Sequence, residues 1–223
     1  MKRATDGEMP FMPLPVSFYE PGANVVARAL LGHWLIRKTE AGFSGGMIVE
    51  TEAYLADDPA SHGFKGRTMR NAAMFGPAGT AYVYFIYGNH WCFNAVCQRE
   101  GVAEAVLIRA VEPRFGIGWM QTQRPVLKAR ELTNGPAKLC AALGIDRRMD
   151  GVSLFNADSP VFIASNPRRQ EDFSALGPEI CTTRIGITRA ADLPLRFYLG
   201  SSELVSRLSA RRLFSLWPET RVF

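Results

Sequence analysis

The chain has 223 residues, 47% hydrophobic and 21% charged, which is enough for one compact globular domain and short for two. Lysine and arginine together number 26 against 21 acidic residues, and the resulting net charge of +5 favours an anionic partner. No stretch approaches the roughly 20 apolar residues of a membrane helix, and the N-terminus lacks the apolar core of a signal peptide. We therefore expect an intracellular protein with no membrane association, located in the cytoplasm or nucleoid if the source is bacterial.

The first predicted elements follow an aperiodic N-terminal arm, residues 1–12, which we expect to be flexible. Asn24 is a suitable N-cap for a short helix that Gly32 would end. The elements predicted up to residue 69 are this helix over 25–31, strands over 33–39 and 46–54, and a polar loop over 55–69.

Two aromatic runs, 81–87 and 91–97, are separated by a Gly-Asn-His turn, a pattern typical of a β-hairpin. The turn length decides which side chains meet. A two-residue loop places Tyr84 opposite Phe93, whereas a three-residue or bulged loop places it opposite Asn94. The sequence leaves this choice open.

The rest of the chain carries short elements that are not interleaved as βαβ units. The predicted helices are 115–123, 128–133 and 137–143, and the predicted strands are 105–111, 152–155, 161–164, 184–188 and 195–199. We expect 165–180 to be an exposed loop and 205–223 a C-terminal extension whose order is left open, so that the domain proper covers 13–204. This pattern predicts a single α+β domain with a curved, mainly antiparallel sheet, a protruding β-hairpin and a few surrounding helices.

The strand over 46–54 carries two acidic residues on one face. Its two-residue period places Glu50, Glu52 and Tyr54 together, either as a solvated face or as a candidate general base. Arg109 lies inside the apolar run 105–111, where an unpaired charge is costly, so it needs an anionic partner, which this strand best offers. A Glu–Arg pair at the floor of a cleft would keep the glutamate ionised and able to take a proton from water.

The hairpin tip is the second unusual feature. Six aromatic residues fall within twelve positions, and the turn leaves Tyr87 at or beside the tip. Tyr87 either folds back on Trp91 as a cross-strand pair or serves as a wedge inserted between base pairs from the minor groove. The wedge interpretation implies a DNA partner.

Two other features have both a structural and a functional interpretation. His62 lies in a polar loop, where a histidine is commonly solvated. The helix start at Gly135-Pro136, with Lys138 one turn further, could hold a phosphate or could be a plain capped helix.

Taken together, several of these motifs form a recognisable series. They are Val49-Glu-Thr-Glu52-Ala-Tyr54, His62, Gly66-x-Thr68-x-Arg70-Asn71-x-x-Met74-Phe75, Gly79-Thr80-x-Tyr82-Val-Tyr84-x-Ile-Tyr87-Gly88, Asn94, Leu107-Ile-Arg109-Ala-x-Glu112-Pro113, Gly135-Pro136-x-Lys138-Leu-Cys140, Arg184-Ile-Gly186-Ile and Leu195-Arg196-Phe197-Tyr198. In this order, from about residue 17 to residue 204, the sequence closely resembles the alkyladenine (3-methyladenine) DNA glycosylase family.

The resemblance implies a monofunctional enzyme that flips alkylated or deaminated purines, of the 3-methyladenine, 7-methylguanine and hypoxanthine class, out of double-stranded DNA. It implies that Glu52 is the general base of N-glycosidic hydrolysis and that Arg109 helps to hold the attacking water. Because the nucleophile it implies is water and no site residue that it assigns is a lysine, we expect no Schiff base and no strand cleavage. No metal and no cofactor are expected, and we expect a monomer acting on damaged DNA.

The resemblance also assigns the residues that contact the flipped base. It implies that Tyr54, His62 and Tyr84 form the walls of the base pocket, that Asn94 disfavours guanine by crowding its exocyclic amine, and that Tyr87 fills the gap left in the duplex. Two alternatives remain at this point: a non-catalytic nucleic-acid-binding module on the same scaffold, and a hydrolase or transferase acting on a small molecule.

Overall fold

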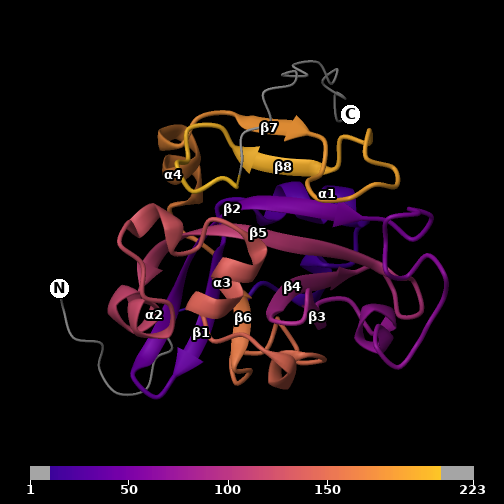
Figure 1. The fold of residues 1–223 in the computed structure, drawn as a ribbon, viewed down its shortest axis with the longest axis horizontal. Helices are drawn as coiled ribbons and strands as arrows, with labels where there is room; N and C mark the ends of the chain where they lie inside the picture. Colours follow the sequence, from indigo (N-terminus) through magenta and orange to yellow (C-terminus); the bar gives the residue numbers. More distant parts are fainter. Residues whose placement is uncertain (1–10, 207–223) are drawn as a thin grey trace.

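The computed structural model describes residues 11–206, which form one curled antiparallel sheet with helices packed around it (Figure 1). The sheet follows the order β3-β4-β5-β2-β1-β6, and β8 pairs with β2 and with β7. The strands are β1 (Trp34–Thr39), β2 (Gly42–Tyr54), β3 (Ala81–Ile86), β4 (His90–Cys97), β5 (Glu104–Phe115), β6 (Val161–Ala164), β7 (Glu179–Thr182) and β8 (Arg196–Leu199). The predicted α+β class and curved antiparallel sheet are confirmed.

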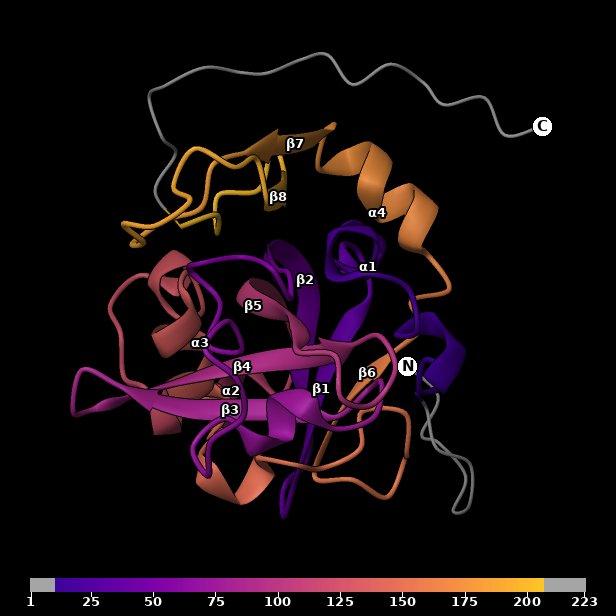
Figure 2. The ribbon, with the colours of Figure 1, turned by 90° about the vertical axis from the view of Figure 1, so that its right-hand side faces the viewer.

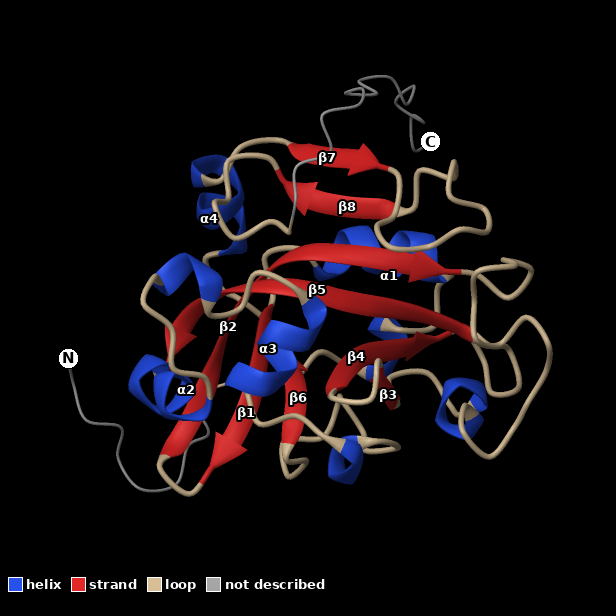
Figure 3. Ribbon diagram, in the orientation of Figure 1, coloured by secondary structure: helices blue, strands red, loops and turns tan. Residues whose placement is uncertain are grey.

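The helices are short and lie around the sheet (Figure 3). They are α1 (Ala23–Leu30), α2 (Ile117–Gln123), α3 (Pro136–Ala142) and α4 (Arg169–Ala175), with 3₁₀ turns at Val16–Phe18, Ala72–Phe75, Ala129–Glu131 and Arg147–Met149. The prediction that Asn24 caps the first helix is wrong, because α1 begins at Ala23 and Gly22 is its N-cap. None of the helices formed within residues 11–206 is long and apolar enough to cross a membrane.

β2 pairs with three other strands of the sheet, β1, β5 and β8. One edge pairs with β5, while the other pairs first with β1 and then, from Glu50 to Glu52, with β8. The strands approach closely at Gly45 and Gly46: a Cβ atom on Gly46 would lie 2.1 Å from the Glu112 carbonyl oxygen, so no larger residue fits there.

The two faces of β2 have different surroundings. The Thr51 hydroxyl donates to the Ala27 carbonyl in α1 at 2.8 Å, so this face packs on the helix. Glu50 and Glu52 lie on the opposite face, where both side chains are fully buried among polar partners. A bulge between Ile48 and Thr51 interrupts the pairing with β5 at this point.

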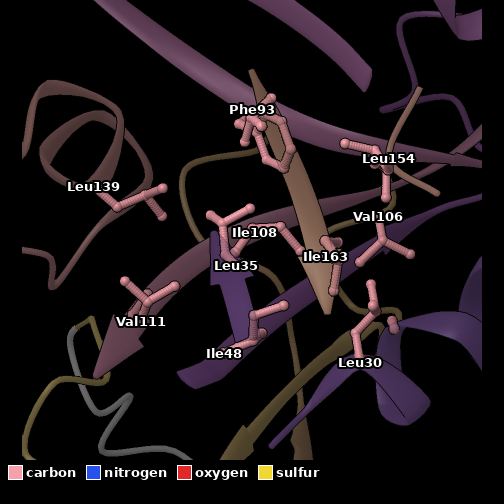
Figure 4. Close-up of a cluster of buried hydrophobic side chains, with 14 of the residues drawn as sticks. Leu30, Leu35, Ile48, Phe93, Val106, Ile108, Val111, Leu139, Leu154 and Ile163 are labelled. Carbon is pink, nitrogen blue, oxygen red and sulfur yellow. The ribbon is translucent and has the colours of Figure 1, made fainter. Parts of the chain in front are cut away.

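The hydrophobic core lies inside the curl of the sheet (Figure 4). Side chains from helices and strands interdigitate there, with α1 and α3 packing against the strands. The residues labelled in the figure are Leu30, Leu35, Ile48, Phe93, Val106, Ile108, Val111, Leu139, Leu154 and Ile163. This core fixes β2 and β5, which carry the charged residues described below.

The described ends of the chain are tied to the sheet. Phe11, which was predicted to belong to the flexible arm, is buried, and its ring lies 5.6 Å from that of Trp34 and 4.9 Å from that of Phe115. The remainder of that arm, 1–10, lies outside the described residues. At the other end, Ser206 hydrogen-bonds to Glu50, so the start of the predicted extension contributes to the buried polar cluster, and 207–223 lie outside the described residues.

Three predicted segments differ in the structure. The segment 165–180 was expected to be a loop but contains α4 and the start of β7, and 152–155 contributes only an isolated bridge from Ser153 to Thr80. The segment 184–188 is not a strand. Gly186 has a φ of +79° there, and the Arg184 side chain turns inward to an ion pair.

Candidate active site

A buried ion pair joins β2 and β5. Arg109 Nη1 lies 3.1 Å from Glu52 Oε2, and Arg109 Nε lies 3.0 Å from Glu50 Oε1. Both glutamates are fully buried and Arg109 is 6% exposed. The expectation that Arg109 finds its anionic partner on this strand is confirmed, and the alternative of a solvated acidic face is wrong.

Among the described residues, the charges of this cluster balance. Besides Arg109, Glu50 pairs with Arg196 of β8, whose Nε lies 2.6 Å from Glu50 Oε1, so residues 11–206 contribute two carboxylates and two guanidinium groups. Burial by itself lowers the pKa of Arg109, but the negative charges of Glu52 and Glu50 outweigh it and raise that pKa above its ordinary value. Arg109 is therefore a permanent cation at the centre of the cluster.

Glu52 receives two hydrogen bonds from the described residues, in addition to its ion pair with Arg109. Oε2 accepts from the Tyr54 hydroxyl at 3.0 Å and faces Arg109 Nη1, and Oε1 accepts from the Ile185 backbone N–H at 2.7 Å. Burial, followed by the negative charge of Glu52, raises the pKa of Tyr54, so its hydroxyl remains a donor. A carboxylate offers about four acceptor positions, so the described residues give Glu52 fewer hydrogen bonds than it can accept.

Tyr54 is backed by a second buried ion pair. The Arg184 guanidinium lies 4.7 Å from the centre of the Tyr54 ring and is clamped by both oxygens of Asp58. Arg184 also donates to the carbonyl oxygens of Ala53 and Ala190. This residue therefore fixes the Tyr54 ring and, through the backbone, the neighbouring Ile185 N–H that reaches Glu52.

The aromatic residues line a cavity of about 400 Å³ that opens beside the cluster. All four residues predicted for the base pocket line it: Tyr54, His62, Tyr84 and Asn94. Its other lining residues include Arg109, Met74, Tyr82, Tyr87, Cys92, Pro136, Ala137, Ile185, Gly186 and Ile187. Glu52 itself does not line the cavity. It contacts Tyr54 and Arg109, and both of these residues line the cavity.

The wall formed by His62 and the hairpin is held by a short network. His62 Nδ1 lies 2.8 Å from the Tyr82 hydroxyl, and the His62 and Tyr84 rings meet edge to face at 4.4 Å. Asn94 donates from Nδ2 to the Tyr82 carbonyl at 3.0 Å, which fixes its amide group. Burial and the positive charge of Arg70 lower the pKa of His62, so the ring is neutral at neutral pH.

The hairpin register differs from both alternatives. The loop has three residues, 87–89, and Tyr84 lies opposite Cys92, while Asn94 lies opposite Tyr82. The loop has the three-residue length of the second alternative but begins one residue earlier than that pairing requires. Because its length is odd, Tyr84 and Asn94 share one face of the hairpin, and both line the cavity.

The hairpin tip carries an exposed and strained tyrosine. Tyr87 is 80% exposed and has a φ of +55°, a left-handed conformation that is costly for a non-glycine residue. It does not fold back on Trp91, which instead packs on Phe85 at 4.8 Å. Arg70 braces this strand by donating from Nη2 to the Phe85 carbonyl at 2.8 Å. In Figure 2 the tip projects to the same side as the loops that precede α3 and β8.

Several residues of the site were not identified from the sequence. Tyr82 and Cys92 lie on the same face of the hairpin as Tyr84, so the two-residue period of the strands could have identified them as cavity residues. Asp58 and Arg184 lie 126 residues apart, and no pattern links them. The Gly135-Pro136 turn joins the cavity wall through Pro136, whereas Lys138 is hydrogen-bonded to Asn134 at 2.8 Å.

The chain matches known proteins over most of its length. The family described as methylpurine-DNA glycosylase matches residues 17–203. A relative from Methanoculleus marisnigri is 50% identical over 198 residues, which cover 88% of this chain and all of the relative. One from Carboxydothermus hydrogenoformans is 46% identical, with 88% of this chain and all of the relative covered. One from Agrobacterium fabrum is 47% identical over 87% of this chain and 92% of the relative.

Each of these relatives carries the name "Putative 3-methyladenine DNA glycosylase". Both the extent of the family match and the identities confirm the resemblance found in the sequence. The chain belongs to the methylpurine-DNA glycosylase family, and it is a DNA repair enzyme that hydrolyses N-glycosyl bonds.

Proposed function

We propose that this glycosylase flips an alkylated or deaminated purine out of the duplex into the cavity beside Arg109 and hydrolyses its N-glycosidic bond with an activated water. The observation that carries the proposal is the buried Glu52 carboxylate, whose ion-pair partner Arg109 and hydrogen-bond donor Tyr54 both line the cavity. A base inside a duplex cannot be attacked, so extrusion must come first.

The proposed hydrolysis assigns a step to each group. Water gives a proton to Glu52 as its oxygen bonds to C1′ of the sugar, and the C1′–N9 bond breaks with its electron pair leaving on the purine. The carboxylate also stabilises the oxocarbenium character that develops on the sugar. The products are the free base and an abasic site, with the DNA strand intact.

The proposed pocket selects flat, electron-poor purines. Tyr54 and the His62–Tyr84 wall offer aromatic surfaces for stacking, and the Asn94 amide is fixed by its bond to Tyr82. In this scheme the fixed amide crowds the exocyclic amine of guanine. A cavity of about 400 Å³ is within the usual range for pockets that hold a small ligand.

The direct test is base release from a duplex that carries a single hypoxanthine or 3-methyladenine, with the undamaged duplex as control. We expect release of the damaged base, strand breaks only after alkaline treatment, and no enzyme–DNA adduct on reduction with borohydride. Tight binding without release would instead identify a non-catalytic binding module. Borohydride trapping would contradict the assignment of water as nucleophile.

Replacing Tyr87 with serine tests the wedge at the hairpin tip. Unstacking a base step costs about a few kcal/mol, and an inserted ring offsets this cost. We expect Tyr87→Ser to lower the rate of base release from duplex DNA by about tenfold or more, since each 1.4 kcal/mol is a factor of about ten. Tyr87→Phe, which keeps the ring, should remain near the wild-type rate. Equal rates for all three proteins would argue against a wedge.

A further inference from the structure

Glu50 is the second carboxylate of the ion cluster, and its hydrogen bonds differ in number from those of Glu52. Oε1 accepts from Arg109 Nε at 3.0 Å and Arg196 Nε at 2.6 Å, and Oε2 accepts from the Ser206 N–H and hydroxyl, both at 2.7 Å. These four donors fill the acceptor positions of a carboxylate. Glu50 therefore has no position left for a water molecule, and any effect it has on the reaction must pass through its neighbours.

The neighbour that links Glu50 to the reaction is Arg109. A guanidinium group is a rigid planar fork, so fixing two of its nitrogens fixes the third. Arg109 Nε is bound to Glu50, and Nη2 donates to the Ser206 hydroxyl at 3.1 Å. These two contacts leave Nη1 directed at Glu52, from which it lies 3.1 Å.

Ser206 closes this arrangement from the end of the described chain. Its N–H and hydroxyl reach Glu50, its hydroxyl also accepts from Arg109, and its carbonyl accepts from Arg196 Nη2 at 2.7 Å. One residue thus contacts three of the four charged groups. Of these contacts, only those of the hydroxyl are lost on substitution by alanine.

We propose that Glu50, held by Arg196 and Ser206, is a positioning residue that fixes the Arg109 guanidinium against Glu52. The inference rests on the proposed function, because Glu52 and Arg109 are taken there to activate the water. The competing explanation is that Glu50 only balances the buried positive charges of Arg109 and Arg196 and has no directional role.

Two variants separate position from charge. Glu50→Gln leaves one excess positive charge in the cluster, which is expected to destabilise the fold. The double variant Glu50→Gln/Arg196→Met restores charge balance between Arg109 and Glu52, but the neutral amide is a weaker anchor for Arg109 Nε than the carboxylate. Charge balance alone predicts that the double variant recovers both stability and rate, whereas positioning predicts that it recovers stability only.

The measurements are single-turnover release of hypoxanthine, affinity for a duplex whose 2′-fluoro nucleotide resists hydrolysis, and the melting temperature. We expect both Glu50 variants to release base about 10- to 100-fold more slowly, with affinity within about threefold of wild type. The double variant should melt closer to the wild-type temperature than Glu50→Gln. A double variant with a rate within threefold of wild type would overturn the proposal.

Ser206→Ala provides a mild variant that should keep the fold, because the backbone N–H that binds Glu50 remains. We expect its rate to fall about three- to tenfold at unchanged affinity, and an unchanged rate counts against the proposal. Glu52→Gln separates the two levels of inference. If Glu52→Gln is inactive while the Glu50 and Ser206 variants are fully active, only the role of Glu50 is wrong. If Glu52→Gln is itself fully active, both are wrong.

Discussion

Replacing Glu52 with glutamine is expected to reduce base release by about 10³-fold, with little change in DNA binding. General base catalysis contributes about 10²- to 10⁴-fold, and a glutamine amide cannot take the proton from water. The side chain would keep its shape, but its amide group must now face the N–H of Ile185 or the donors of Arg109 and Tyr54, so the hydrogen bonds around it also weaken. Single-turnover release from hypoxanthine-containing duplex measures the first effect, and fluorescence anisotropy measures binding.

Glu100→Gln is the matched control, because it removes the same charge at an exposed position. It should release base at the wild-type rate. A Glu52→Gln rate within about tenfold of wild type would mean that another group accepts the proton, and the assignment of Glu52 as the base would then be abandoned.

Replacing Asp58 with asparagine is expected to lower the stability of the fold strongly. Asp58→Asn leaves the Arg184 guanidinium buried without its counterion, since the two side chains are 1% and 0% exposed. Breaking a buried ion pair from one side costs about 3–5 kcal/mol. For a domain of this size each kcal/mol lowers the melting temperature by about 2–4 °C, so we expect a drop of roughly 6–20 °C. Chemical denaturation measures the free energy of unfolding directly.

Two further variants check that the loss of stability comes from the unpaired Arg184 charge. Asp58→Asn/Arg184→Met removes the unpaired charge and should recover much of the lost stability, because an apolar replacement of a buried pair is commonly neutral. Glu171→Gln breaks the Arg168–Glu171 pair, whose side chains are about 70% exposed, and should change stability by no more than about 1 kcal/mol. If Asp58→Asn is as mild as Glu171→Gln, the buried pair is not a major source of stability.

The sequence predicted the parts of the site that obey a local period. Arg109 in an apolar run required a buried anion, and the two-residue period of β2 correctly placed Glu50 and Glu52 on one face. For the hairpin the period left two alternatives, and only the one with a three-residue or bulged loop placed Tyr84 and Asn94 on one face, as they are in the structure. What the period could not distinguish is which glutamate receives more hydrogen bonds, because these come from Ser206 and Ile185, residues far along the chain.

The errors have equally specific causes. The α4 segment is polar and has few apolar residues, so its helical period is weak, and the predicted loop over 165–180 was wrong. The strand predicted over 184–188 failed because its leading arginine is used in a buried ion pair with Asp58. The hairpin register was left open, and neither alternative included the observed loop over 87–89, in which Tyr87 adopts a left-handed conformation that the residue type does not predict.

The late arrival of β8 has a consequence for synthesis of the chain. The edge of β2 from Glu50 to Glu52 pairs with β8, and Arg196 lies 146 residues beyond Glu50. Until the ribosome has made that strand, this part of β2 has an open edge of the kind on which chains aggregate. Charged side chains on such an edge oppose pairing with another molecule. We therefore expect Glu50 and Glu52 to oppose such pairing in the nascent chain, and the buried ion cluster can assemble only after Arg196 has been translated.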